Sequence, residues 1–97
     1  MSKLTPGMKR RIKSEMSGEK PTVWVGKGQV SRELLDEILK QLNKREIVKV
    51  KILKSALAEA KASEIALTVS TQTEAALVEV RGHTFVLYKR RRRGLKK

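Results

Sequence analysis

Between residues 22 and 52 the spacing of the apolar residues changes twice, from strand-like to helical and back. Residues 22–25 are β-branched or aromatic, which favours a short strand. Ser31 can cap a following helix, whose apolar positions recur at helical spacing and end near Asn43. Residues 47–52 alternate in a way that is typical of a strand buried on one face. This order predicts a parallel strand pair joined by a right-handed crossover.

A further helix is expected before this unit. Thr5 can cap it and Pro6 suits its first position, while Gly18 and Pro21 limit its extent. Its apolar residues recur every four positions and form one stripe, which consists of Leu4, Met8, Ile12 and Met16.

After the unit, helical spacing returns from about Ala58 to Thr71. Strands are expected at residues 76–81 and 84–88, joined by a tight turn at Gly82 and His83. The complete order is α-β-α-β-α-β-β. It predicts an α/β fold in which a four-stranded mixed sheet carries three helices.

Basic residues are concentrated at the two ends of the chain. The 97 residues include 23 Lys and Arg against 10 Asp and Glu, a formal net charge of +13. The net charge is +4 over residues 1–20, +2 over residues 21–88 and +7 over residues 89–97. We therefore expect one folded domain over residues 1–89, a basic tail over residues 90–97, and a polyanionic partner: RNA, DNA or an anionic membrane surface.

Several kinds of site are excluded by composition. The sequence has no cysteine, which excludes a disulfide framework, a thiolate zinc site and a cysteine nucleophile, and its single histidine cannot form a histidine metal cluster. No apolar run approaches the roughly 20 residues of a membrane span, and no signal-peptide pattern is present. An amphipathic anchor with aromatic residues, which binding to a membrane surface would need, is also missing. We expect a cytoplasmic protein with no cofactor, no membrane partner and no small-molecule substrate.

A glycine-containing segment joins the first strand to the second helix, and it consists of Gly26, Lys27, Gly28 and Gln29. Glycines at such a junction let backbone N–H groups approach a phosphate, and the helix dipole favours its charge. Lys27 adds a positive charge at the tip, and Arg32 adds another in the first helical turn. The alternative is a tight turn that needs glycine backbone angles. The pattern is not a nucleotide P-loop.

Two more groups of cations are candidates for nucleic-acid contacts. The tail carries four consecutive arginines, Arg90, Arg91, Arg92 and Arg93. Such a run gives salt-sensitive, sequence-blind binding to phosphates, or else serves only as a solubilising tail. Three cations of the first helix lie off its apolar stripe, and they form either an RNA-facing surface or a solvated face: Lys9, Arg10 and Lys13.

Several strand residues have two interpretations each. Lys49 and Lys51 either contribute to a positive sheet face or only keep that face solvated. No aromatic signature of a stacking platform is present, so Trp24, Phe85 and Tyr88 are expected to pack in the core or at an edge. Trp24 is the best candidate for an exception, because it lies just before the glycine segment.

The sequence contains little that indicates a catalytic site. Glu33 and Glu37 are spaced to share a metal ion, but carboxylates at such positions more often balance nearby cations and the helix N-terminus. His83 has no carboxylate or nucleophile beside it in sequence. We therefore expect no catalytic residue and no metal site.

Three stretches together resemble the CRM domain, named for chloroplast RNA splicing and ribosome maturation. They are Val23 to Ser31 with the glycine segment, Arg45 to Ile52, and Val80 to Lys89. The resemblance covers about residues 5–89 and is nearest to the stand-alone YhbY-like RNA-binding proteins. It implies a fold like the C-terminal domain of bacterial translation initiation factor three, and RNA binding through a GxxG loop with nearby basic residues.

Carried over to this sequence, Gly26 matches the first glycine of that loop, and Lys27 and Gly28 match its middle positions. Gln29 stands where the second glycine is expected. A side chain there limits close approach and positive backbone angles. Gly28 can partly substitute, and the Gln29 amide can hydrogen-bond RNA instead.

The sequence and the resemblance together predict a monomeric, non-enzymatic RNA-binding protein. Its target is ribosomal RNA in a precursor of the large ribosomal subunit, held or protected during assembly. The binding-class alternative is a DNA-coating or chromatin-architectural protein that contacts phosphates. A small metal-dependent nuclease and a ribosomal protein that stays in the mature particle are two further hypotheses.

Overall fold

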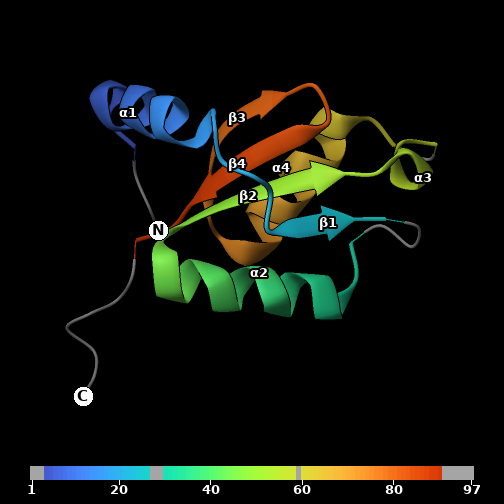
Figure 1. Cartoon of the computed structure of the whole chain (residues 1–97). Coiled ribbons are helices and arrows are strands. Elements are labelled where there is room, and N and C mark those ends of the chain that lie inside the picture. The colour runs from blue at the N-terminus through green and yellow to red at the C-terminus, as the bar shows by residue number, and fades with distance from the viewer. Residues whose placement is uncertain (1–3, 27–29, 59, 91–97) are drawn as a thin grey trace, which may run out of the picture.

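The fold is an α/β arrangement around one sheet (Figure 1). The computed structural model describes residues 4–26, 30–58 and 60–90. Its elements are α1 (Pro6–Met16), β1 (Val23–Val25), α2 (Arg32–Arg45), β2 (Ile47–Ile52), α3 (Lys54–Leu57), α4 (Ala62–Thr73), β3 (Ala76–Arg81) and β4 (Thr84–Tyr88). The strand order is β1-β2-β4-β3. β1 and β2 are parallel and the other two pairs are antiparallel, so the predicted mixed sheet is confirmed.

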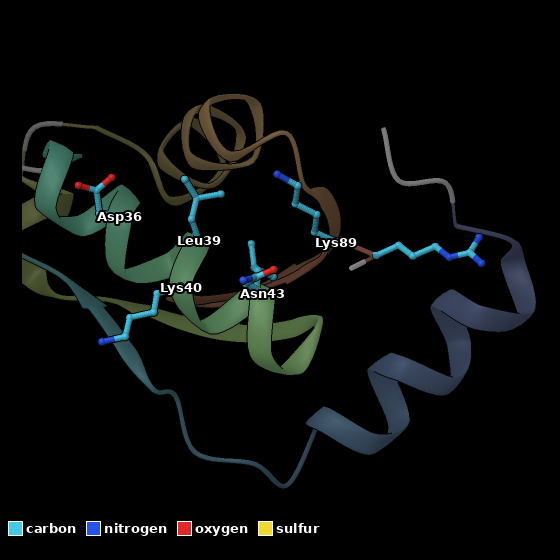
Figure 2. A pocket seen from close by; sticks show the side chains of 7 residues that line it. Asp36, Leu39, Lys40, Asn43 and Lys89 are labelled. Atoms are coloured by element: carbon cyan, nitrogen blue, oxygen red, sulfur yellow. The ribbon is translucent and has the colours of Figure 1, made fainter. Parts of the chain in front are cut away.

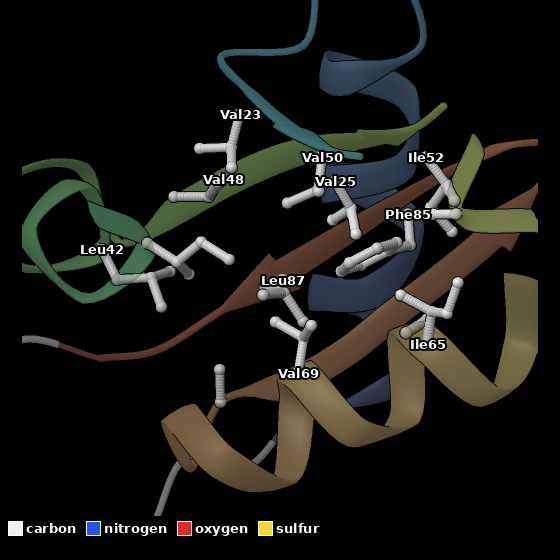
Figure 3. Packing of buried hydrophobic residues seen from close by; sticks show 14 residues of the cluster. Val23, Val25, Leu42, Val48, Val50, Ile52, Ile65, Val69, Phe85 and Leu87 are labelled. Atoms are coloured by element: carbon white, nitrogen blue, oxygen red, sulfur yellow. The ribbon is translucent and has the colours of Figure 1, made fainter. Parts of the chain in front are cut away.

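Helices lie on both faces of this sheet. We call the face covered by α2 and α4 the inner face, and the face on which α1 packs the outer face (Figure 1). The larger core cluster fills the inner face, and Figure 3 shows its strand and helix side chains interdigitating. A smaller cluster on the outer face joins Ile12 of α1 to Val78 and Val86. Both faces of the sheet carry apolar side chains, so each face needs a layer of helix to cover it.

The alternation predicted for β2 is present in the structure. Val48, Val50 and Ile52 are buried in the inner-face cluster. The intervening residues therefore lie on the outer face, where Ile47 packs against the small cluster and Lys51 is exposed. The register follows from this pattern, because a slip by one residue would place lysines in the core.

Polar residues define the ends of the helices. The Thr5 hydroxyl accepts a hydrogen bond from the N–H of Met8 at 3.1 Å, and the Ser31 hydroxyl accepts one from the N–H of Leu34 at 3.1 Å. Both caps agree with the sequence prediction, and each satisfies one N–H that has no partner within its helix. α2 ends at Arg45, two residues beyond the expected Asn43, and the left-handed residue Glu46 turns the chain directly into β2.

The predicted third helix differs from the observed one in its start. The apolar spacing predicts a continuous helix from about Ala58 to Thr71, but α4 begins at Ala62, and the single-turn helix α3 precedes it. Alanines in this stretch favour helix wherever it begins, so their spacing does not mark the break. The start of α4 is stabilised by a hydrogen bond from the Lys61 backbone N–H to the Glu64 carboxylate at 3.3 Å.

Candidate nucleic-acid interface

The glycine segment leaves the sheet where β1 and β2 both end. Val25 is paired with Ile52 at this end, and Gly26 follows directly. A Cβ at Gly26 would lie 3.5 Å from Leu53 Cδ1 and 3.8 Å from Ser55 Oγ, which are ordinary contacts. Its φ angle is not in the left-handed region. Neither backbone angle nor space therefore requires glycine at position 26.

The other side of the segment is the N-terminus of α2. Ser31 caps this helix, and the side chain of Arg32 in its first turn is exposed. The N–H groups of Arg32 and Glu33 precede the first intrahelical hydrogen bond, which is made by Leu35 to the Ser31 carbonyl. These donors and the Arg32 charge can bind an anion together. The predicted contacts of Lys27, Gly28 and Gln29 lie outside the described residues.

The cations predicted on the first helix lie elsewhere. Lys9, Arg10 and Lys13 are exposed on α1, and among the described residues none of them has an ion-pair partner. α1 packs through Ile12 on β3 and β4, on the outer face of the sheet. β1 and β3 are the two edge strands of the sheet, so α1 lies toward the edge opposite to β1.

Arg90 follows β4 at the other end of the sheet. Tyr88 is paired with Ile47, the first residue of β2, whereas the glycine segment follows the last residues of the parallel pair. The two ends of β2 are about 17 Å apart at about 3.3 Å per residue. Figure 2 shows a hollow between α2 and the chain after β4, lined by Asp36, Leu39, Lys40, Leu42, Asn43, Lys89 and Arg90. Arg91, Arg92 and Arg93 lie outside the described residues.

The predicted binding residues therefore form two groups and not one surface. Gly26 and Arg32 lie at the end of the sheet where β1 stops. The second group lies away from this end, because the α1 cations lie on a helix packed over β3 and β4, and Arg90 follows β4 at the opposite end of the sheet. A polyanion that touches both groups must span most of the domain.

Lys49 and Lys51 have different environments, although they are equivalent in the strand pattern. The Nζ of Lys49 donates to the carbonyl oxygens of Met16 at 2.9 Å and Glu19 at 2.8 Å. It thereby fixes the C-terminal end of α1 and the connector that leads to β1. Lys51, two residues further on, is exposed and has no ion-pair partner among the described residues. Lys49 is a structural residue, a role that neither interpretation of the sequence included.

Substitution of Lys49 with methionine is expected to lower the free energy of unfolding by about 1.5–3 kcal/mol, because the hydrogen bonds from a charged donor are removed. Urea unfolding followed by circular dichroism measures this change. Lys51→Met is the matched control on the same strand, and its change is expected to stay within about 0.5 kcal/mol. Equal losses of stability for the two variants would contradict the role assigned to Lys49.

The aromatic residues also differ in burial. Phe85 is fully buried and Tyr88 is half-buried, so both pack as expected. Trp24 lies on the edge strand β1 and is 54% exposed, so it is the exception to packing for which the sequence made it the best candidate. Its position before the glycine segment was the only sequence feature that indicated this exception.

Glu37 and His83, which were considered for catalysis, make hydrogen bonds that join parts of the fold. The Glu37 carboxylate accepts a hydrogen bond from Gln41 at 2.9 Å, and the Gln41 side-chain oxygen accepts one from the Thr22 hydroxyl at 2.6 Å. The His83 carbonyl accepts from the N–H of Ile52 at 2.6 Å. Within the described residues, no group of three or more His, Cys, Asp or Glu side chains is placed to hold a metal ion.

No helix among the described residues combines the length and apolar content needed to cross a bilayer.

Comparison with known proteins gives one consistent result. The family model of the CRS1 / YhbY (CRM) domain matches residues 4–89. "Probable RNA-binding protein MJ0652" of Methanocaldococcus jannaschii is 39% identical over 95 residues, which cover 98% of this chain and 69% of that protein. "Probable RNA-binding protein YqeI" of Bacillus subtilis is 33% identical over 86 residues, which cover 89% of this chain and 88% of that protein.

The fold has a counterpart of known structure. The solution structure of the hypothetical protein SAV1595 from Staphylococcus aureus matches with a TM-score of 0.73 and 28% identity, over 93% of this chain and 92% of that one. The family match, the two relatives and the structural neighbour each cover most of this chain. The chain belongs to the CRS1 / YhbY (CRM) domain family.

Proposed function

We propose that this protein is a non-catalytic RNA-binding protein that binds ribosomal RNA in precursors of the large ribosomal subunit. The observation that carries the proposal is family membership, because two relatives that cover nearly the whole chain are named as probable RNA-binding proteins. The net charge of +13 supports a polyanionic partner. Ribosomal RNA is the target that the resemblance to YhbY-like proteins implies.

The proposed contact is made by the glycine segment and the start of α2. The N–H groups at this helix start and the exposed Arg32 side chain provide donors and charge for one RNA phosphate. Lys27 contributes a second charge from the segment itself. Such contacts neutralise phosphates and release counterions, so binding should weaken steeply as salt rises.

The direct test is a titration of a structured fragment of large-subunit ribosomal RNA, compared with duplex DNA of matched charge at the same salt. We expect the RNA to bind more tightly. The double variant Lys27→Ala/Arg32→Ala should reduce the slope of log affinity against log salt by about 1 for each phosphate that is no longer neutralised. The charge-matched control is Lys20→Ala/Lys40→Ala, which changes two cations away from the segment and should leave affinity nearly unchanged.

Crosslinking in cells, followed by sequencing of the bound RNA, tests the target. Crosslinks should concentrate on precursor large-subunit ribosomal RNA and disappear in the Lys27→Ala/Arg32→Ala variant. A preference for duplex DNA in the titration would overturn the proposal and favour the DNA-coating hypothesis. Crosslinks spread evenly over cellular RNA would overturn the ribosomal target while leaving RNA binding in place.

A further inference from the structure

We propose that the outer face of the sheet holds a second RNA contact, at which one unpaired base stacks on Trp24 and neighbouring phosphates bind Lys51 and Arg81. This inference rests on the proposed RNA-binding function and adds a site outside the glycine segment. It specifies the substrate as single-stranded RNA at this face.

The first step is the orientation of Trp24. Its neighbours Val23 and Val25 are 4% and 0% exposed and belong to the inner-face cluster. Since successive strand residues point to opposite faces, the indole of Trp24 lies on the outer face. It is 54% exposed there, so a large apolar ring faces solvent.

The second step is the strand register, which places three further residues in line with Trp24. Trp24 is paired with Lys51, Lys51 with Thr84, and Thr84 with Arg81. We call these four residues the outer row. It crosses all four strands, and the distance between its two ends is about 14 Å, because adjacent strands are about 4.8 Å apart.

The third step is that the outer row lies beyond the cover provided by α1. That helix packs on Val78, Val86, Ile47 and Tyr88, and its connector to β1 is held at Lys49. The outer row lies two residues further along β2, at the end where the glycine segment begins. Lys51 and Arg81 are exposed, and among the described residues neither has an ion-pair partner.

The chemistry of the row fits an unpaired nucleotide. Stacking of a base on an aromatic side chain strengthens binding by about 5- to 100-fold and tolerates any base. Cations beside the ring bind the phosphates of the same strand. A base inside an A-form duplex cannot stack on the Trp24 ring, because both of its faces are already stacked on neighbouring bases. Two cations and no carboxylate in the row match a polyanion and disfavour a basic or neutral peptide.

The position of the row connects it to the proposed main site. Trp24 precedes Gly26 by two residues, and the side chain of Leu53, the residue after β2, lies against Gly26. A single strand that leaves the start of α2 can therefore continue around the β1 edge of the sheet onto the outer row.

Trp24 is the only tryptophan of the chain, so all tryptophan emission comes from this residue. The test titrates an unstructured single-stranded RNA of about 10 nucleotides, and a duplex RNA of equal charge, against the full-length protein. We expect the single strand to quench the emission and the duplex to leave it nearly unchanged. Trp24→Ala should weaken single-strand binding by about 5- to 100-fold, and Trp24→Phe should retain most of it. Lys51→Ala/Arg81→Ala should reduce the salt slope by about 1–2.

Leu67→Ala is the matched control, because Leu67 is 60% exposed on α4, away from the outer face. The Leu67→Ala variant should bind single-stranded RNA with the affinity of the wild type. Wild-type affinity in Trp24→Ala, or equal quenching by the duplex, would overturn this inference. Quenching by an acidic peptide or by anionic vesicles, but not by single-stranded RNA, would also overturn it.

The two proposals fail in different ways. If wild-type protein binds no RNA of either kind, the proposed function itself is wrong. If it binds RNA, and Lys27→Ala/Arg32→Ala weakens binding while Trp24→Ala does not, the main site stands and only the outer row is refuted.

Discussion

Replacement of Phe85 with alanine is expected to lower the free energy of unfolding by about 3–5 kcal/mol. Phe85 is fully buried in the inner-face cluster (Figure 3). In the strand register it is paired with Val50 of β2 and with Val80 of β3. Alanine removes the ring and leaves a cavity where the central strands meet α4. Because a domain of this kind has a total stability of about 5–15 kcal/mol, the loss of stability is a large part of the whole.

Urea unfolding followed by circular dichroism measures this effect. Leu67→Ala is the control, since it also truncates a large apolar side chain but one that is 60% exposed. Its change should stay within about 0.5 kcal/mol. A loss of stability below about 1 kcal/mol for Phe85→Ala would show that the sheet is not packed around this ring.

The elements of the sheet could be predicted because each depends on local pattern. The alternation in β2 assigned Val48, Val50 and Ile52 to one face, and the structure buries these residues together. The two strands of the last hairpin have the predicted bounds. Ser31 was identified as a helix cap because a hydroxyl before an apolar helical pattern has a local physical role.

The features that sequence reasoning missed depend on contacts between distant residues. Lys49 and Lys51 have the same place in the alternation, but only Lys49 faces the carbonyl groups at the end of α1, about 30 residues earlier in the chain. The break between α3 and α4 lies in a stretch whose residues all favour helix, so propensity does not locate it. The exposure of Trp24, which the sequence offered as an exception, also has a distant cause, because α1 packs over β3 and β4 and not over β1.

The candidate site could be predicted only in part for the same reason. The types of residue that suit phosphate binding can be listed from charge and glycine content. Their relative positions cannot be read from the sequence, because they depend on the strand order and on which face α1 covers: Arg32 lies at the β1 edge, whereas the α1 cations lie toward β3.

Truncation after Lys89 is expected to reduce the salt dependence of RNA binding more than any single substitution. The truncation removes four arginines and two lysines, and therefore six positive charges. If each neutralises one phosphate of a single strand, the slope of log affinity against log salt falls by about 4. Affinity at low salt should drop sharply, while the preference for RNA over duplex DNA should remain, because charge alone does not distinguish them.

Fluorescence anisotropy with a labelled RNA, measured at several salt concentrations, tests this expectation. The control is the full-length protein in which all four arginines of residues 90–93 are replaced by lysine, which keeps the charge and should keep the slope. An unchanged slope after truncation would show that the tail does not contact RNA. Loss of the RNA preference together with the tail would mean that the glycine segment adds no discrimination, and that the protein binds nucleic acids by charge alone.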